Sequence, residues 1–392
     1  MTRCGQAIAL AVCIVTTLFV ATLRADDDHI RYTIAFRAEN PWPVGVLGMI
    51  DPDGSRQKFL DFKRPKQKGW QWGSRLPDGR VILTSLEAAD VAEIRAGKVV
   101  SHSWLYSFAS GKLTKLLERD PLSKNIYVQT VLPGERRLLA LVFLDGEQRL
   151  YEMDLDGGNP VALTKPGEGF CYGVSLSPDG KRVAMHVTGG GESPFNPGHY
   201  SINVIDLATR GRSLVSGAKG HLYFGPQWSP DGKWLAFLDC HADIDPRHFS
   251  ADLCIARPDG SEHRVVTSGR RHWFGTGYGS NVTSWSPDGK TITYCRLLPG
   301  STTSGKGGTQ ICLLNPFTGD VTELNEPVDG DWHCRLAWSP DGRQLAFVKS
   351  GTRGRELWLM DADGRNAKLL TRGLKDQGAD HPAWLPSASD RD

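Results

Sequence analysis

Histidine is the residue type of this chain best suited to chemistry, because imidazole binds metal ions and transfers protons near neutral pH. The chain contains 11 histidines. Seven of them fall at the starts of predicted strands or in predicted connections, namely His199, His221, His241, His248, His272, His333 and His381. Each could instead only bond a neighbouring backbone carbonyl. Whether these histidines form a functional site therefore depends on whether the fold brings them close together.

The elements that must position these residues are encoded in a repeat. The segment QWSPDGKWLAF at 227–237 is typical of a strand, a tight turn and a returning strand. Pro230 sets φ at the first corner, Asp231 can bond its own backbone, and Gly232 supplies a positive φ. Similar segments recur with turn prolines at Pro77, Pro133, Pro178, Pro230, Pro287, Pro340 and Pro386. Steps of roughly 45 to 57 residues are typical of propeller blades.

These seven anchors predict an all-β chain folded as one seven-bladed β-propeller over residues 26–392. Residues 30–36, 44–50 and 57–62 read as strands b, c and d of a blade that lacks strand a. Residues 381–385 read as a single strand a. We therefore expect a velcro closure, in which the C-terminal strand a completes the N-terminal strands b, c and d and removes the open edges.

The longer insertions are predicted between strands b and c, at 87–103, 189–199, 241–250, 299–309 and 350–355. In a four-stranded blade, b–c loops and blade-to-blade connections share one face, so this face should be rich in loops. The seven histidines fall on it, and three or four could converge near the central channel, as a metal ion or an acidic ligand requires. Four further candidates for ligand binding lie there: Trp273, Trp332, Arg247 and Arg271.

The pattern WSPDGRQLAF at 338–347, followed by LWLMDADGRNAKLLT at 357–371, resembles the repeat of TolB-like propellers of the WD40 type. The resemblance covers essentially all of the chain after its leader. It implies the fold but no single activity, because that family includes scaffolds, peptidase appendages and lyases. TolB itself is six-bladed and has an additional α/β domain, so the resemblance implies no role in a Tol complex.

A second, partial resemblance is to oligogalacturonate lyases, carried by GHLY at 220–223 and AFLDCH at 236–241. It implies that His241 is a catalytic acid or base in β-elimination on uronides. Gln377 and His381 are similar to that family's metal motif, which implies a divalent ion, Mn or Ca, held with His221 or His333. The sequence departs from the family pattern: Gln377 and His381 are one residue too far apart, and Ala383 replaces a metal histidine.

Six cysteines follow the leader, and two pairs lie on predicted neighbouring strands of one blade. Cys240 and Cys254 fall on strands b and c of one blade, and Cys295 and Cys312 on those of the next. Adjacent antiparallel strands bring Cβ atoms within reach of a disulfide, and export permits oxidation. We therefore expect the bridges Cys240–Cys254 and Cys295–Cys312, although buried free thiols would give the same pattern.

The N-terminus reads as an export signal, with Arg3, an apolar run over 7–23 and cleavage near Ala25. The sequence thus predicts a leader at 1–25, or alternatively an uncleaved anchor, and a periplasmic or secreted protein without a further membrane span. Lys and Arg number 46 against 44 Asp and Glu. This balance argues against binding to nucleic acid.

Two classes of function remain. The first is a non-catalytic, monomeric propeller that binds a protein or an acidic glycan on its loop-rich face. The second is a metal-dependent polysaccharide lyase, or an inactive relative of one. No Gly-x-Ser-x-Gly elbow, phosphate-binding Gly-rich loop or Cys-x-x-Cys motif is present in the sequence.

Overall fold

The computed structural model describes residues 29–36, 45–60, 67–76, 80–87, 100–108, 110–119, 122, 126–134, 136–188, 200–241, 250–269, 272–273, 284–301, 306–351, 354–371 and 377–385. Every regular element in these ranges is a β-strand. They include no helix long and apolar enough to cross a membrane. The predicted leader at 1–25 and the candidates Arg247 and Arg271 lie outside the described residues.

The strands form antiparallel groups of four, or of five in the group that begins with β20, and we call these groups blades and name them by their strands. Three of them are separate sheets. The first consists of β4 (Gln67–Arg75), β5 (Val81–Glu87), β6 (Val100–Tyr106) and β7 (Leu113–Lys115). The second consists of β25 (Trp332–Trp338), β26 (Gln344–Gly351), β27 (Gly354–Asp361) and β28 (Lys368–Leu369). The third has the order β29 (Gln377–Leu385), β1 (His29–Phe36), β2 (Gly45–Ile50) and β3 (Lys58–Leu60).

The remaining strands form further antiparallel groups, which edge pairings such as β10 with β12 and β14 with β16 link together. The first of these groups consists of β8 (Ile126–Val131), β9 (Arg137–Leu144), β10 (Glu147–Asp154) and β11 (Val161–Ala162). The second consists of β12 (Phe170–Leu176), β13 (Arg182–Thr188), β14 (Tyr200–Asp206) and β15 (Arg212–Ser216). The next is β16 (His221–Trp228), β17 (Leu235–His241), β18 (Ser250–Ala256), β19 (Arg264–Val265). The last is β20 (His272–Trp273), β21 (Ser284–Trp285), β22 (Ile292–Leu297), β23 (Thr309–Leu314), β24 (Val321–Glu323).

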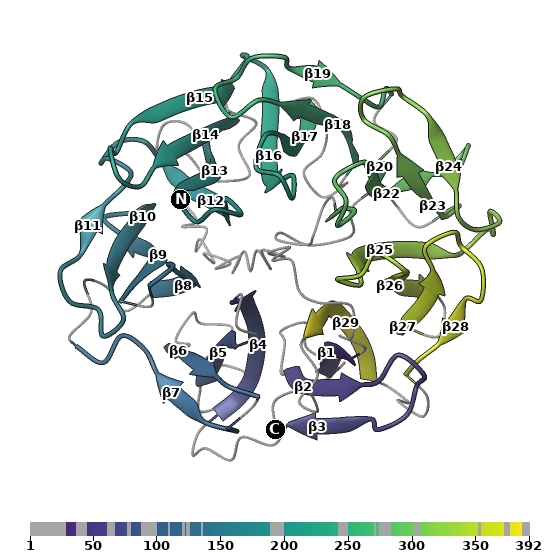
Figure 1. Cartoon of the computed structure of the whole chain (residues 1–392), viewed down its shortest axis with the longest axis horizontal. Coiled ribbons are helices and arrows are strands. Elements are labelled where there is room, and N and C mark those ends of the chain that lie inside the picture. The colour runs from purple at the N-terminus through teal and green to yellow at the C-terminus, as the bar shows by residue number, and fades with distance from the viewer. Residues whose placement is uncertain are drawn as a thin grey trace, which may run out of the picture.

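The blades are arranged around a common axis, with first strands such as β8, β12 and β16 on the inner side (Figure 1). This is a propeller-type fold. The first and last strands lie in one blade, where β1 pairs antiparallel with β29 over His29 to Phe36. The predicted terminal strands are therefore present, and β29 begins at Gln377 rather than at the expected His381.

The core lies between blades, because each sheet is apolar on both faces. In β17, Leu235 and Phe237 belong to a buried cluster shared with blade β12–β15. Ala236 and Leu238 belong to another, shared with blade β20–β24. Side chains alternate across a strand, so an uninterrupted apolar run buries both faces of a sheet. Burial between neighbours therefore holds the blades together.

The repeated SPDG turn connects the first two strands of a blade through side-chain hydrogen bonds. In the turn after β12, Asp179 accepts hydrogen bonds from Ser177 Oγ at 2.5 Å and from the Lys181 N–H at 3.1 Å. Gly180 has a φ of 70°. A Cβ at Gly180 would lie 2.3 Å from Cγ of Pro133 in the preceding turn. Glycine therefore permits both the turn and the close contact between successive turns.

A tryptophan two residues before the turn proline links each of several blades to the one before it. The indole N–H groups of Trp228, Trp285 and Trp384 donate to backbone oxygens of Ser175, Gln227 and Ala337 at 2.9, 3.3 and 3.0 Å. Among the described residues, the buried Trp338 Nε1 has no acceptor. The equivalent oxygen, that of Ser284, accepts Thr293 Oγ1 at 3.0 Å instead.

This difference predicts unequal effects of the same substitution. Trp228→Phe and Trp338→Phe both remove buried ring atoms and should lower the free energy of unfolding. Trp228→Phe should cost about 1 to 2 kcal/mol more than Trp338→Phe, because it also removes a buried hydrogen bond and leaves an oxygen unsatisfied. Urea denaturation of both variants measures the difference, and equal losses would contradict the assignment.

The two predicted disulfides are wrong: all six cysteines of the described residues are free thiols in the interior. Cys240 lies in the cluster facing blade β20–β24, whereas Cys254 lies in the cluster facing blade β12–β15. Cys295 and Cys312 are likewise divided between two clusters. Residues on neighbouring strands share a face when they are directly opposed or offset by an even number of positions, and Cys254 is opposed to Phe237, three residues before Cys240.

Candidate functional site

A row of aromatic rings crosses three successive blades at the end that carries the longer connections. It comprises Phe143, Phe170, Tyr172, His186, Tyr200 and Phe224. Successive ring centroids from Phe143 to Tyr200 lie 5.6 to 6.2 Å apart. Phe170 and Tyr172 share a face of β12 because they are two residues apart, and His186 is the cross-strand neighbour of Tyr172. We call this set the aromatic row.

His186 is the centre of the aromatic row and is packed against two glycines. Phe224 of β16 approaches it edge-on at 6.0 Å, and the Gly225 N–H donates to its Nδ1 at 3.4 Å. A Cβ at Gly173 would lie 2.6 Å from the same nitrogen. Burial lowers the pKa of His186 to about 3. The imidazole is therefore neutral at physiological pH, which agrees with its role as an acceptor.

Burial varies along the aromatic row. Tyr172 is as buried as His186, each with 8% of its surface exposed. Phe143, Phe170, Tyr200 and Phe224 are half-buried. Tyr172 and His186 are thus the buried part of the row, and the partly exposed rings of Phe170 and Tyr200 lie where strands β12 and β14 begin.

A histidine–aspartate pair lies beside the aromatic row, at the same end of blade β16–β19. His221 Nδ1 is 2.9 Å from both carboxylate oxygens of Asp239, and the imidazole is stacked on Tyr223 at 5.3 Å. The side chain of His221 is 30% exposed, while that of Asp239 is 3% exposed. Because a carboxylate only accepts, Nδ1 carries the proton and directs it to Asp239.

A second buried carboxylate lies directly opposite Asp239, on β18. Asp239 and Asp252 are cross-strand partners, and both are buried. Thr267 Oγ1 donates to Asp252 at 3.3 Å while it accepts the Leu253 N–H at 2.8 Å. Facing carboxylates repel each other, so His221 on one side and Thr267 on the other offset that repulsion. Together these groups can bind hydroxyls or transfer a proton.

Two other predicted ligand residues, His272 and His333, bond neighbouring backbone groups. His272 Nδ1 accepts the Cys295 N–H at 3.2 Å, and His333 Nδ1 lies 2.9 Å from the backbone oxygen of Thr309. Both imidazoles are buried. Burial lowers the pKa of His333 to about 4, against a smaller opposite effect of its hydrogen bond to Thr309.

The predicted metal ligands are distributed over three blades. His221 lies on β16, His333 on β25, and both Gln377 and His381 on β29. His333 and His221 each use Nδ1 within the protein. Within the described residues, no group of three or more His, Cys, Asp or Glu side chains is arranged to hold a metal ion. The structure therefore does not group His221, His333 and His381, the described members of this set, around one position.

The remaining candidates are placed by their backbones. His241 is the last residue of β17, in register with His221, and Trp273 pairs with Ser250. The side chains of His241, Trp273 and Gln377 lie outside the described residues. Trp332 is half-buried and packs against Cys334 and Val348.

Sequence reasoning missed the aromatic row and the two aspartates. The signals were present: Phe170 and Tyr172 alternate at the start of a strand, and Asp239 interrupts the apolar run of β17. Neither could be interpreted alone, because the row needs Phe143 and Phe224 from neighbouring blades.

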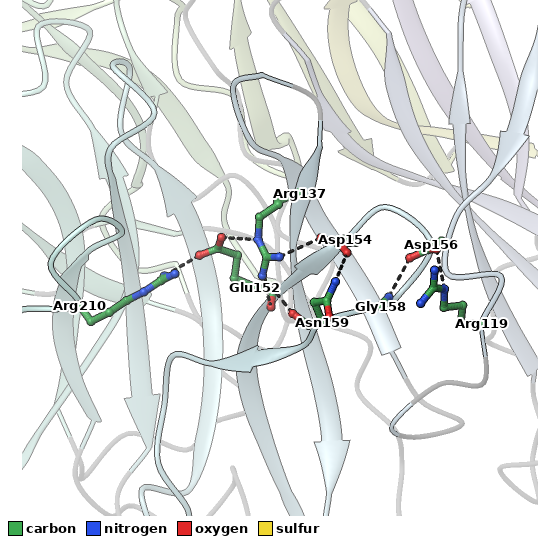
Figure 2. A network of polar contacts seen from close by, with 8 residues as sticks. All are labelled: Arg119, Arg137, Glu152, Asp154, Asp156, Gly158, Asn159 and Arg210. Atoms are coloured by element: carbon green, nitrogen blue, oxygen red, sulfur yellow. Dashed lines mark hydrogen bonds and ion pairs between the residues drawn. The ribbon is translucent and has the colours of Figure 1, made fainter.

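The polar network at the opposite end of the blades is of a different kind (Figure 2). Glu152 accepts Arg137 of its own blade and Arg210 of the next, each at 2.5 Å. Arg137 also binds Asp154 at 2.8 Å, and Arg119 of the preceding blade binds Asp156 at 2.7 Å. These ion pairs are mutually satisfied and link three successive blades, so this end holds the blades together.

The fold and this division between its two ends define the molecule as a β-propeller. Residues 142–390 match PD40, the TolB beta propeller domain family, and the chain belongs to that family. Over 266 residues it is 29% identical to the Tol-Pal system protein TolB of Gluconobacter oxydans. The match covers 65% of this chain and 50% of TolB, so the chain spans half the length of that relative.

Solved structures give the same fold at low sequence identity. A Mycobacterium tuberculosis puromycin-hydrolyzing peptidase matches with a TM-score of 0.63 at 14% identity, covering 96% of this chain and 55% of the peptidase. An oligogalacturonate lyase in complex with manganese matches with a TM-score of 0.54 at 16% identity, covering 86% of this chain and 84% of the lyase. At such identities the likeness concerns the fold alone.

Two of the buried histidines, His186 and His333, predict acid sensitivity of the fold. Their pKa values of about 3 and 4 lie below the 6.5 of a solvated imidazole, so the unfolded chain binds more protons below pH 6.5. Stability should therefore fall as pH decreases from 6.5 towards 4, by up to about 1.4 kcal/mol per pH unit for each histidine.

Urea denaturation of the wild type, His186→Gln and His333→Gln at pH 7, 6 and 5 measures this dependence. Each variant should lose less stability on acidification than the wild type, because glutamine does not titrate. Identical slopes in all three proteins would show that these histidines are not responsible.

Proposed function

We propose that this chain is an exported, TolB-like propeller that binds a protein or an acidic glycan at the loop-rich end of its blades. The observation that carries the proposal is the aromatic row with half-buried rings at its end, beside the His221–Asp239 pair. Aromatic faces with a few fixed polar groups are the usual composition of ligand sites. The opposite end offers ion pairs that already satisfy one another.

Export is part of the proposal. It is supported by the leader-like sequence at 1–25 and by the similarity to a Tol-Pal system protein. The partner itself is identified only by chemistry: aromatic stacking surfaces and a histidine–carboxylate pair suit sugar rings and their hydroxyls.

Binding can be tested with a variant at each end of the blades. Phe170→Ala combined with Tyr200→Ala should reduce binding to immobilised acidic oligosaccharides at least about tenfold, because stacking surface is lost. Arg119→Ala, at the opposite end, should leave binding unchanged. Equal binding by all three proteins would contradict a site at the aromatic row, and the same variants can be compared on periplasmic extract for a protein partner.

The alternative function is a polysaccharide lyase acting on uronides. The observation that favours it is the contact of His221 Nδ1 with the buried Asp239, an arrangement typical of a general base, together with the register of His241 opposite His221 on the next strand. In β-elimination a base removes the proton next to a carboxylate while the bond to the leaving oxygen breaks. No step through a metal is derived, since the structure does not group the described members of the predicted ligand set around one position.

Incubation with oligogalacturonate, with and without Mn²⁺, separates the two functions. The binding proposal expects no rise in ultraviolet absorbance from an unsaturated product. A rise that disappears in His221→Ala or His241→Ala would replace it with the lyase function.

We further infer that the ring has seven blades and that β29 closes it with β1, β2 and β3. Three observations support this: the β1–β29 pairing, the Trp384 hydrogen bond to Ala337, and a buried cluster that joins Leu385 to Val81 and Leu83. The last cluster connects the final strand to the blade β4–β7.

Deleting residues 380–392 should then lower the melting temperature by at least about 10 °C, because it removes the buried Trp384 and Leu385. Deleting only 386–392 leaves β29 intact and serves as the control. A melting temperature that is the same for both deletions would contradict the closure.

A further inference from the structure

Two residues within strands adopt a left-handed backbone conformation that strains any residue with a side chain. Among the described residues, the other non-glycine residues with positive φ lie in turns and connections. Arg335 has a φ of 54° inside β25, and His381 has a φ of 58° inside β29. Strain of this kind persists only where the surroundings enforce it, and it concentrates at functional positions.

The two positions are equivalent in their blades. Each precedes the turn proline, Pro340 or Pro386, by five residues. The same position is Gly173, with a φ of 61°, in blade β12–β15 and Gly225, with a φ of 66°, in blade β16–β19. The bulge in the first strand thus requires a left-handed residue, and glycine meets the requirement without strain. In two neighbouring blades the position carries a basic or imidazole side chain instead.

The strands that hold these residues are the inner edges of adjacent blades, and β25 and β29 contact one another. Both residues interact with other parts of the chain. The acidic Asp331, next to the start of β25, is engaged by Lys349 at 2.6 Å. A guanidinium presents a fork of N–H donors that fits a carboxylate or a phosphate, and an imidazole can add another donor.

We propose that Arg335 and His381 form an anion-binding position on the inner side of the ring, which takes the carboxylate or phosphate group of a ligand. The strained basic residues are retained at a glycine position because they bind this group. The position differs from the aromatic row and does not depend on a ligand there. It also gives His381 a role other than the metal ligand that the sequence suggested.

Calorimetric titration with malonate and with inorganic phosphate tests this in wild type, Arg335→Gly and His381→Gly. The wild type should bind at least one anion saturably, and each variant should bind it at least about tenfold more weakly. The melting temperature should stay within about 3 °C of the wild type or rise, since glycine relieves the strain. Asp145→Gly is the control, because Asp145 is left-handed in a turn with a φ of 52°. It should keep the wild-type affinity.

Tighter binding of malonate assigns a carboxylate ligand, and tighter binding of phosphate assigns a phosphate ligand. If a glycine variant does not fold, Arg335→Asn and His381→Asn replace it, because asparagine tolerates this conformation without the cation. Wild-type affinity in the glycine or asparagine variants would overturn the proposal. So would the absence of saturable binding of both anions by the wild type.

Discussion

The structure depends on burial of both faces of every blade. The strand β17 illustrates the constraint: alternate residues of one apolar run enter two separate clusters, each shared with a different neighbour. Removing such a sheet from either neighbour would expose a row of large apolar side chains to water, which is strongly unfavourable. A linear stack would leave one face uncovered at each end. The closed arrangement proposed above would give every face a partner, and indole hydrogen bonds link successive blades.

The same constraint favours polar groups towards the ends of strands, with exceptions such as Arg335 inside β25. The middles of the strands are committed to burial, so charged groups such as Asp239 and Lys349 occur where strands meet their connections. At the end with tight turns, those connections are short and repeated, and their polar groups satisfy one another, as in the bonds from Ser177 and Lys181 to Asp179. At the other end the connections vary in length and sequence. Ligand recognition can therefore diversify there without disturbing the packing.

Much of the fold follows from the sequence because its signals are local. The Pro-Asp-Gly turns and the apolar runs beside them predict strands that the structure contains, including β1 and β29 at the two ends of the chain. Register is harder to predict, and the cysteines show why. Cys254 is opposed to Phe237, three residues before Cys240, and that odd separation places the two thiols on opposite faces of the sheet. A change in the register between two strands is therefore enough to prevent a disulfide, even when the strand boundaries are unchanged.

The candidate site was less predictable because its members come from different blades. The type of residue identified His221, but its partner Asp239 is 18 positions away. His272 and His333 have similar sequence contexts and instead bond the backbone of blade β20–β24. Distinguishing these cases requires knowing which backbone groups each imidazole reaches.

The contact of His186 with Gly173 and Gly225 has a consequence for how this sequence can diverge. The imidazole occupies the space that a side chain at 173 would need and accepts the amide of residue 225. Three positions in two repeats therefore behave as one inherited unit. A larger residue at 173 is tolerable only in a lineage that has already shortened residue 186. The repeats that form blades β12–β15 and β16–β19 therefore cannot simply be replaced by the repeat of another blade.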